Sequence, residues 1–171
     1  MVKNGKGLIV NVSSAGGLSY LFNVAYGVGK QALDRMSADM AVELKSNGIT
    51  CVSLWPGAVR TQLIMGALED EKYAQSSVGK MFVEGETIEY PGKAVVALAT
   101  DKRSILKTGR ILVTSDLGDE YGFVDIDGRH PYNIRSVSVM LKHYGWAKTS
   151  EYVPSWFKLP GWLITAAVSK L

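Results

Sequence analysis

The chain has 171 residues, of which 47% are hydrophobic and 20% are charged, a composition typical of a globular protein with a buried core. Its net charge of +3 is small and spread along the chain, which argues against a nucleic-acid-binding protein. The single cysteine, Cys51, cannot form an intramolecular disulfide, and neither histidine has metal-ligand spacing with it or with the other. We therefore expect no metal site.

Short apolar segments and segments of helical period alternate along the first two thirds of the chain. The pattern predicts, in order, a strand at 8–12, a helix that opens near Tyr26 and stops at Asn47-Gly48, a strand at 49–54, a helix at 91–99 and a strand at 109–114. This order is typical of a parallel sheet, so we predict an α/β fold. Residues 62–89 are charged, and we expect them to form an irregular lid over a substrate.

Tyr26 and Lys30 lie four residues apart in the first predicted helix, so their side chains share one face. A phenol ionises at about pH 10 and is a poor acid-base catalyst at neutral pH, but a nearby ammonium group favours the ionised form. Such a pair can exchange a proton with the oxygen of a carbonyl group. Ser14 follows the first strand and can bind the same oxygen, because open α/β sheets bind ligands at the carboxyl ends of their strands.

A Tyr-x-x-x-Lys spacing is weakly specific by itself. Tyr144 and Lys148 have it too, but no apolar strand ending in Ser-Ser precedes them, and we interpret that second match as coincidence. Taken alone, the pair favours a structural interpretation, in which Tyr26 packs as part of an amphipathic helix and Lys30 is a solvated lysine. The surrounding pattern favours chemistry, because the strand at 8–12 leads into Ser13-Ser14 twelve residues before Tyr26.

A third motif, Pro56-Gly57-Ala58-Val59-Arg60-Thr61, follows the second predicted strand. With the Ser-Ser and Tyr-x-x-x-Lys motifs in this order, residues 8–117 resemble the catalytic half of the short-chain dehydrogenases/reductases. The resemblance implies a Rossmann-type, doubly wound parallel sheet and hydride transfer between NAD or NADP and a carbonyl or alcohol substrate, of steroid or lipid-like character. The phrase Ser-Leu-Trp-Pro-Gly and the Trp/Pro-rich tail resemble one individual member of that family.

The resemblance also implies roles for single residues. Tyr26 becomes the general acid-base, Lys30 assists it and binds the nicotinamide ribose, and Ser14 positions the substrate carbonyl. The spacing from Ser14 to Tyr26 is one residue shorter than is commonest in the family, which leaves Ser13 as the alternative serine. The turn after the second strand is expected to contact the cofactor, through Pro56, Gly57, Val59 and Thr61.

No glycine-rich phosphate-binding turn precedes Leu8. We therefore expect residues 1–118 to be the C-terminal part of a Rossmann-type domain that lacks the N-terminal cofactor-binding strands, and residues 119–171 to be a C-terminal extension. The alternative is a truncated, non-catalytic fragment or an interaction module that binds no cofactor. The choice between NAD and NADP stays open, and the full-length protein is expected to be a homo-oligomer.

Residues 152–171 concentrate aromatic and apolar side chains around Pro154 and Pro160. No apolar stretch reaches the roughly 18 residues that a membrane-spanning helix needs. The tail is a clamp over the substrate site, an oligomer contact, a segment lying on a membrane surface, or an extension packed on its own domain. The chain ends Ser169-Lys170-Leu171, a peroxisomal address, so we expect the peroxisome, with the surface of the endoplasmic reticulum membrane or the cytoplasm as alternatives.

Overall fold

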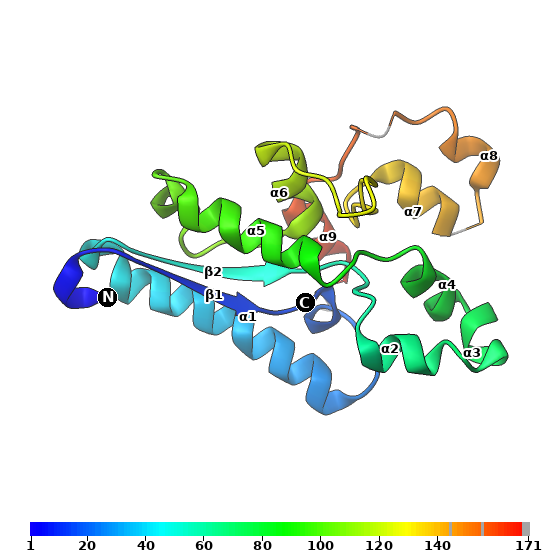
Figure 1. The fold of residues 1–171 in the computed structure, drawn as a ribbon, viewed down its shortest axis with the longest axis horizontal. Coiled ribbons are helices and arrows are strands. Elements are labelled where there is room, and N and C mark those ends of the chain that lie inside the picture. Colours follow the sequence, from blue (N-terminus) through cyan, green and yellow to red (C-terminus); the bar gives the residue numbers. More distant parts are fainter. Residues whose placement is uncertain (144, 155, 169–171) are drawn as a thin grey trace. The chain divides into compact units, whose positions relative to one another are not determined.

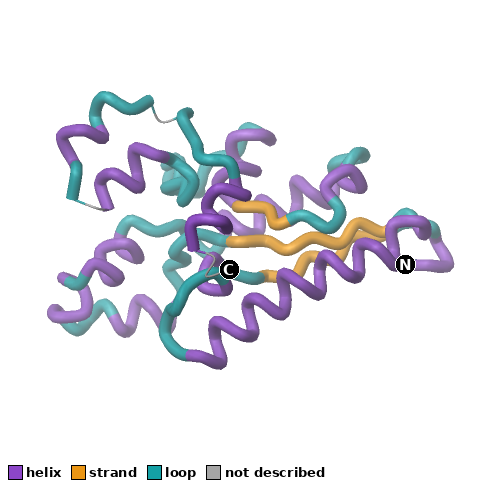
Figure 2. Tube along the Cα trace, turned by 180° about the vertical axis from the view of Figure 1, so that it is seen from behind, coloured by secondary structure: helices purple, strands orange, loops and turns teal. Residues whose placement is uncertain are grey.

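The computed structural model describes residues 1–143, 145–154 and 156–168. The chain forms two compact units, Met1–Pro131 and Tyr132–Leu171. The first unit contains a parallel sheet of three strands, β1 (Gly7–Val12), β2 (Ile49–Trp55) and β3 (Ile111–Val113), in the order β1-β2-β3 (Figure 2). The predicted α/β class and parallel pairing are confirmed. The expected division into 1–118 and 119–171 follows the family resemblance and stays a prediction.

The central strand β2 is buried along its whole length, as expected for a parallel strand covered on both faces. Its register places Val12 of β1 beside Leu54, and Val113 of β3 beside Trp55. The carboxyl ends of all three strands therefore meet at one edge of the sheet. Cys51 lies in this strand without a disulfide, and burial raises the pKa of its thiol.

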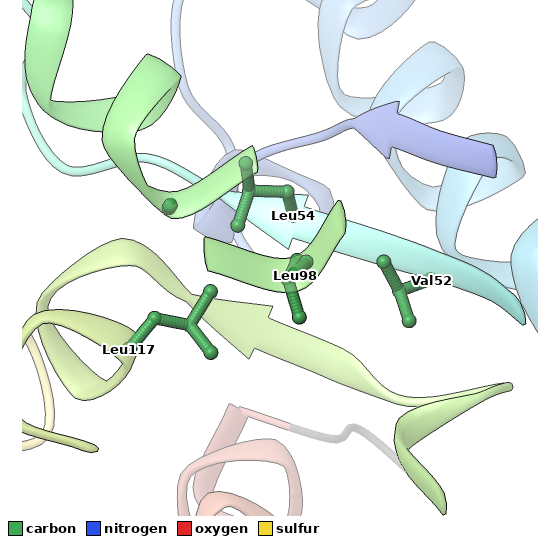
Figure 3. Close-up of a cluster of buried hydrophobic side chains, with 5 residues drawn as sticks. Val52, Leu54, Leu98 and Leu117 are labelled. Atoms are coloured by element: carbon green, nitrogen blue, oxygen red, sulfur yellow. The ribbon is translucent and has the colours of Figure 1, made fainter. Parts of the chain in front are cut away.

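Helices α1 (Val24–Leu44) and α5 (Glu89–Thr100) cover opposite faces of the sheet (Figure 1). The α5 face holds the apolar core, in which Val52 and Leu54 of β2 pack with Ala94, Leu98 and Leu117 (Figure 3). Alternate residues of β2 point to the other face, toward α1. The sheet therefore has one predominantly apolar side and, as described below, one side that contains a buried carboxylate.

Helix α1 begins two residues before Tyr26, where the side chain of Asn23 accepts a hydrogen bond of 2.9 Å from the Tyr26 amide. It runs on through a 3-10 turn, Lys45–Asn47, to Gly48, whose φ of +69° is the left-handed conformation that favours glycine. The Asn47-Gly48 stop is confirmed. Helix α5 is also confirmed, with Pro91 in its first turn.

The expectation of an irregular segment at 62–89 is wrong. Three short helices lie there, α2 (Gln62–Ala67), α3 (Glu71–Gln75) and α4 (Ser77–Val83). Their N-termini are capped by side-chain oxygens of Thr61, Asp70 and Ser76. Helices of five to seven residues are too short to show a clear apolar period. Their capping residues were the signal from which these helices could have been predicted.

The third strand is shorter than predicted, because Thr114 already begins helix α6 (Thr114–Tyr121). Three further 3-10 turns lie at Val2–Asn4, Ala15–Gly17 and Ser104–Lys107. The unit Tyr132–Leu171 contains α7 (Val137–His143), α8 (Ala147–Ser150) and α9 (Gly161–Val168). No helix in the described ranges has both the length and the apolar character needed to cross a membrane.

Candidate active site

The three sequence motifs meet at the carboxyl edge of the sheet. Ser13-Ser14 follows β1 directly, and Pro56-Gly57 follows β2 directly. The backbone amide of Ser13 donates to the carbonyl of Leu54 over 2.8 Å, so the sheet pairing continues into the first motif. This is the edge at which open α/β sheets bind their ligands.

The two serines are used differently. Ser13 is buried, and its hydroxyl donates to the main-chain carbonyl of Lys30 over 2.8 Å, which ties the end of β1 to α1. Ser14 is half-buried, and its Oγ accepts a hydrogen bond of 3.1 Å from the amide of Gly16. That bond caps the 3-10 turn Ala15–Gly17 and leaves the hydroxyl hydrogen of Ser14 free to point elsewhere.

The Tyr26 ring lies against this serine turn. A Cβ atom built on Gly16 would come within 2.7 Å of Cε1 of Tyr26, so only glycine allows the turn to pack directly on the ring. On the same helix, the Lys30 Nζ lies 5.5 Å from the centre of the Tyr26 ring. Phe22 packs edge-on against Tyr26 with ring centres 5.0 Å apart. The structure thus brings the serine turn, Tyr26 and Lys30 together.

The residues present fit a nicotinamide ribose. The Nζ of Lys30 donates to the carbonyl of Val12 over 3.1 Å, which anchors the ammonium group at the end of β1. An ammonium group has three donors, so two remain for the hydroxyl groups of a sugar. Lys30 is only half-buried, which keeps these donors within reach of a ligand.

Glu86, a residue that the sequence analysis did not identify, binds the turn after β2. Glu86 accepts a hydrogen bond of 2.9 Å from the amide of Gly57, and Val59 forms a parallel β-bridge with Glu86. Thr61 is exposed, and its Oγ1 accepts from the Ile64 amide at the start of α2. Pro56, Gly57, Val59 and Thr61 therefore form one continuous surface segment at the carboxyl edge.

Glu86 is almost fully buried, with 1% of its surface exposed. Burial is the main cause that raises the pKa of its carboxyl group to about 7, against the lowering effect of hydrogen bonds from Thr114 and Gly57. No sequence signal identified this residue, because a glutamate within a charged segment reads as solvated.

Asp34 is a second buried carboxylate that the sequence interpretation missed. It lies on α1 one turn beyond Lys30, and its Oδ1 accepts from the Ser53 hydroxyl over 2.5 Å and from the Trp55 indole over 2.9 Å. Its other oxygen, Oδ2, is buried with no hydrogen-bond partner among the described residues. The spacing of Asp34 from Lys30 on one helix face was the signal that could have found it.

Two predictions fall outside what can be described. Tyr144 of the second Tyr-x-x-x-Lys match and the terminal Ser169-Lys170-Leu171 are not among the described residues. In the ranges that are described, no group of three or more His, Cys, Asp or Glu side chains gathers as a metal site would require.

Comparisons with known proteins show which family this chain resembles. A family model described as short chain dehydrogenase matches residues 1–72. The chain is 45% identical to dehydrogenase/reductase SDR family member 1 of Homo sapiens and 42% identical to the protein of that name from Mus musculus, over 99% of this chain and 56% of each relative. The chain thus spans about half the length of these curated relatives.

A solved structure extends the match to the fold. A putative NAD(P)-dependent gluconate 5-dehydrogenase from Beutenbergia cavernae, with NADP bound at low occupancy, superposes with a TM-score of 0.57 and 25% identity, over 69% of this chain and 47% of that one. These matches confirm the Rossmann-type fold and the resemblance to one individual family member. The chain belongs to the short-chain dehydrogenase/reductase family.

Proposed function

We propose that this chain carries the proton-transfer part of an oxidoreductase site that acts on a carbonyl or alcohol substrate with NAD or NADP. The observation that supports this most directly is the contact of the Tyr26 ring with both the serine turn at Gly16 and the ammonium group of Lys30. A tyrosine used only for packing has no need of a neighbouring cation at the ligand-binding edge of a sheet.

In this proposal Tyr26 donates its hydroxyl proton to the carbonyl oxygen during reduction and takes it back during oxidation. Lys30 assists Tyr26 and donates to the ribose hydroxyls, while the Ser14 hydroxyl holds the carbonyl oxygen in place. When bound, the nicotinamide supplies or accepts the hydride. The role of Ser14 is supported by the burial of the Ser13 hydroxyl against the Lys30 carbonyl.

The turn after β2 completes the cofactor contact in this proposal. Pro56, Gly57 and Val59 face the nicotinamide carboxamide with their backbone, and the exposed Thr61 hydroxyl meets the diphosphate. A steroid or other lipid-like carbonyl compound is the proposed substrate class, covered by the short helices α2 to α4. The preference between NADP and NAD is left to experiment.

The alternative is a non-catalytic interaction module, and an activity assay separates the two. In the full-length context, we expect oxidation of NADPH or NADH with at least one member of a panel of steroid, retinoid and aliphatic ketones. Ser14→Ala should slow this reaction, whereas Ser13→Ala should mainly lower stability, by about 1 kcal/mol, because its hydrogen bond lies inside the protein. No oxidation with either cofactor and any ketone would favour the module.

A second proposal concerns the unit Tyr132–Leu171. Four of its aromatic side chains are 62% to 87% exposed: Trp146, Tyr152, Trp156 and Trp162. Exposed tryptophans next to lysines are typical of segments that lie on a membrane surface, so we propose such a contact. Sedimentation with anionic vesicles tests it, and the double substitution of Trp156 and Trp162 by Ala should release the protein.

Peroxisomal delivery through Ser169-Lys170-Leu171 is proposed as well, with the endoplasmic reticulum membrane surface or the cytoplasm as alternatives. Deleting these three residues should move a tagged protein out of peroxisomes.

Assembly of the full-length protein into a homo-oligomer is supported by the exposed Val24, Val28 and Val42 on α1. Light scattering of the purified protein tests that proposal.

A further inference from the structure

Glu86 connects the ends of two strands. Its Oε1 accepts from the amide of Gly57, just beyond β2, and its Oε2 accepts from the hydroxyl of Thr114, just beyond β3, each over 2.9 Å. Both oxygens of one buried carboxyl group are thus used at the edge of the sheet that carries the candidate site. One bond is to a backbone amide, which can only donate, and the other is to a hydroxyl, which can donate or accept.

The backbone around Glu86 reinforces this link. Its amide donates to the carbonyl of Ala58, and its carbonyl accepts from the amide of Arg60, each over 2.9 Å. The preceding Gly85 approaches so closely that a Cβ atom there would lie 1.9 Å from the carbonyl oxygen of Ala58. The two segments can meet at this distance only because residue 85 is glycine.

We propose that Glu86 is the positioning residue of the Pro56–Thr61 turn and that gain or loss of its proton changes how firmly the turn is held. The inference rests on the proposed function, in which this turn contacts the cofactor. The ionised carboxylate holds the Gly57 amide with a charge-assisted hydrogen bond. The neutral acid holds it with a weaker bond, and its own hydrogen can then be donated to Thr114 in a reversed bond.

The acidic groups around Glu86 oppose its ionisation. Asp125, 2% exposed, is one of them, and its carboxylate accepts from the amide of Thr87 over 2.8 Å and from the Thr87 hydroxyl. On α5, Tyr90 is buried, and burial, with further contributions from Glu86, Asp119 and Asp125, raises its pKa to about 12.

The cations on the neighbouring segments pair with other groups, and Arg129 also donates to the main-chain carbonyls of Glu84 and Gly85, just before Glu86. The Arg60 and Arg129 guanidinium groups pair with Asp127 over 3.1 and 2.7 Å, and Lys93 donates to the carbonyl of Val124. Within the described ranges, Glu86 forms no ion pair. Burial and the Asp125 charge therefore outweigh the two hydrogen bonds, and its pKa of about 7 puts both forms within the physiological range.

The experiment is a pH titration of the 171-residue chain, followed by the backbone amide resonances in NMR spectra between pH 5 and pH 9. We expect the Gly57 amide to shift with a midpoint of about 7. Glu86→Gln keeps an oxygen for Gly57 and a donor for Thr114, and should abolish the titration. A Gly57 resonance that does not titrate in the wild type, or still titrates in Glu86→Gln, would overturn the inference.

Two further variants distinguish a charge effect from a general loss of structure. Thr114→Val removes a bond that lowers the pKa of Glu86 and should raise the midpoint, whereas Asp125→Asn removes a repelling charge and should lower it. Asp39→Asn, on the exposed surface of α1, is the matched control and should leave the midpoint unchanged. Equal midpoints in all variants would also overturn the inference. Because the readout needs no cofactor or substrate, its failure is distinguishable from failure of the proposed function.

Discussion

Two buried carboxylates support the candidate site in different ways. Asp34 binds two side chains within β2, Ser53 and Trp55, and so fixes the strand to the helix that carries Tyr26. Glu86 binds groups beyond the strand ends and so fixes a turn. The strand and its turn are thus stabilised by separate carboxyl groups, and the pKa of the one that holds the turn is raised to about 7.

The largest expected effect on stability is the pH dependence that Glu86 causes. Its pKa is raised from 4.5 to about 7, so between these values the folded protein binds more protons than the unfolded chain. The free energy of unfolding therefore falls as pH rises through this window, by about 3 kcal/mol in total, and levels off above pH 7.

Urea denaturation of wild type and Glu86→Gln at pH 5 and pH 8 isolates this contribution. The wild type should lose about 2.5 kcal/mol relative to the variant between the two values, since part of the total is already lost at pH 5. Groups with lowered pKa values, such as Asp127 beside Arg129, act on both proteins alike and cancel. Equal pH dependence of the two proteins would contradict the assignment of this group.

Asp34→Ala should cost roughly 2–3 kcal/mol, because it leaves the hydroxyl of Ser53 and the indole N–H of Trp55 buried without an acceptor. Asp34→Asn keeps one oxygen for both donors and should cost less. The measurement is urea denaturation at fixed pH. If alanine and asparagine were equally harmless, Asp34 would not hold the strand to α1.

The sequence predicted those elements of the fold whose signal lies within a short stretch of the chain. The strands β1 and β2 and helices α1 and α5 were predicted because their apolar patterns are local and long enough to read. The end of β3 was misplaced because Thr114, favourable in a strand, begins a helix instead.

The candidate site shows the same division. Tyr26, Lys30 and the serines could be singled out from their spacing along the chain, and the structure brings them together. Glu86 could not be singled out in this way, because its partners Gly57 and Thr114 lie 29 and 28 residues away and only the fold brings them to it. A charged residue that is buried by segments distant in the sequence leaves no periodic pattern in the sequence around it. Such a residue is therefore predicted to be exposed to solvent.

Thr114→Val should have a smaller effect that depends on pH. Above pH 7 the ionised Glu86 loses a donor, at a cost of about 1.5–3 kcal/mol, whereas below pH 6 the neutral acid loses only an ordinary hydrogen bond of about 1 kcal/mol. Denaturation at pH 8 and pH 5 compares the two. A cost that is larger at the acidic pH would contradict the picture of a hydroxyl partner that reverses its bond.

The smallest effect gives a baseline for a contact without a buried charge. Asn23→Ala removes the cap from the Tyr26 amide at the exposed start of α1 and should cost about 1 kcal/mol, independent of pH between 5 and 8. Asn23→Asp, which keeps a capping oxygen, should restore most of the stability. Thermal denaturation of the three proteins is sufficient, and an Ala variant as stable as the wild type would mean that the cap contributes nothing.

In the proposed function, Tyr26 transfers the proton at a site that Lys30 and the serine turn complete. The most direct test of this proposal is single-turnover reduction of a ketone substrate by the NADPH-loaded enzyme in the full-length context, comparing Tyr26→Phe with Tyr20→Phe, an exposed tyrosine next to the same turn. Tyr26→Phe should be slower by about 10²–10⁴ with its fold intact by circular dichroism, and Tyr20→Phe should match the wild type. Near-normal turnover by Tyr26→Phe would contradict the account.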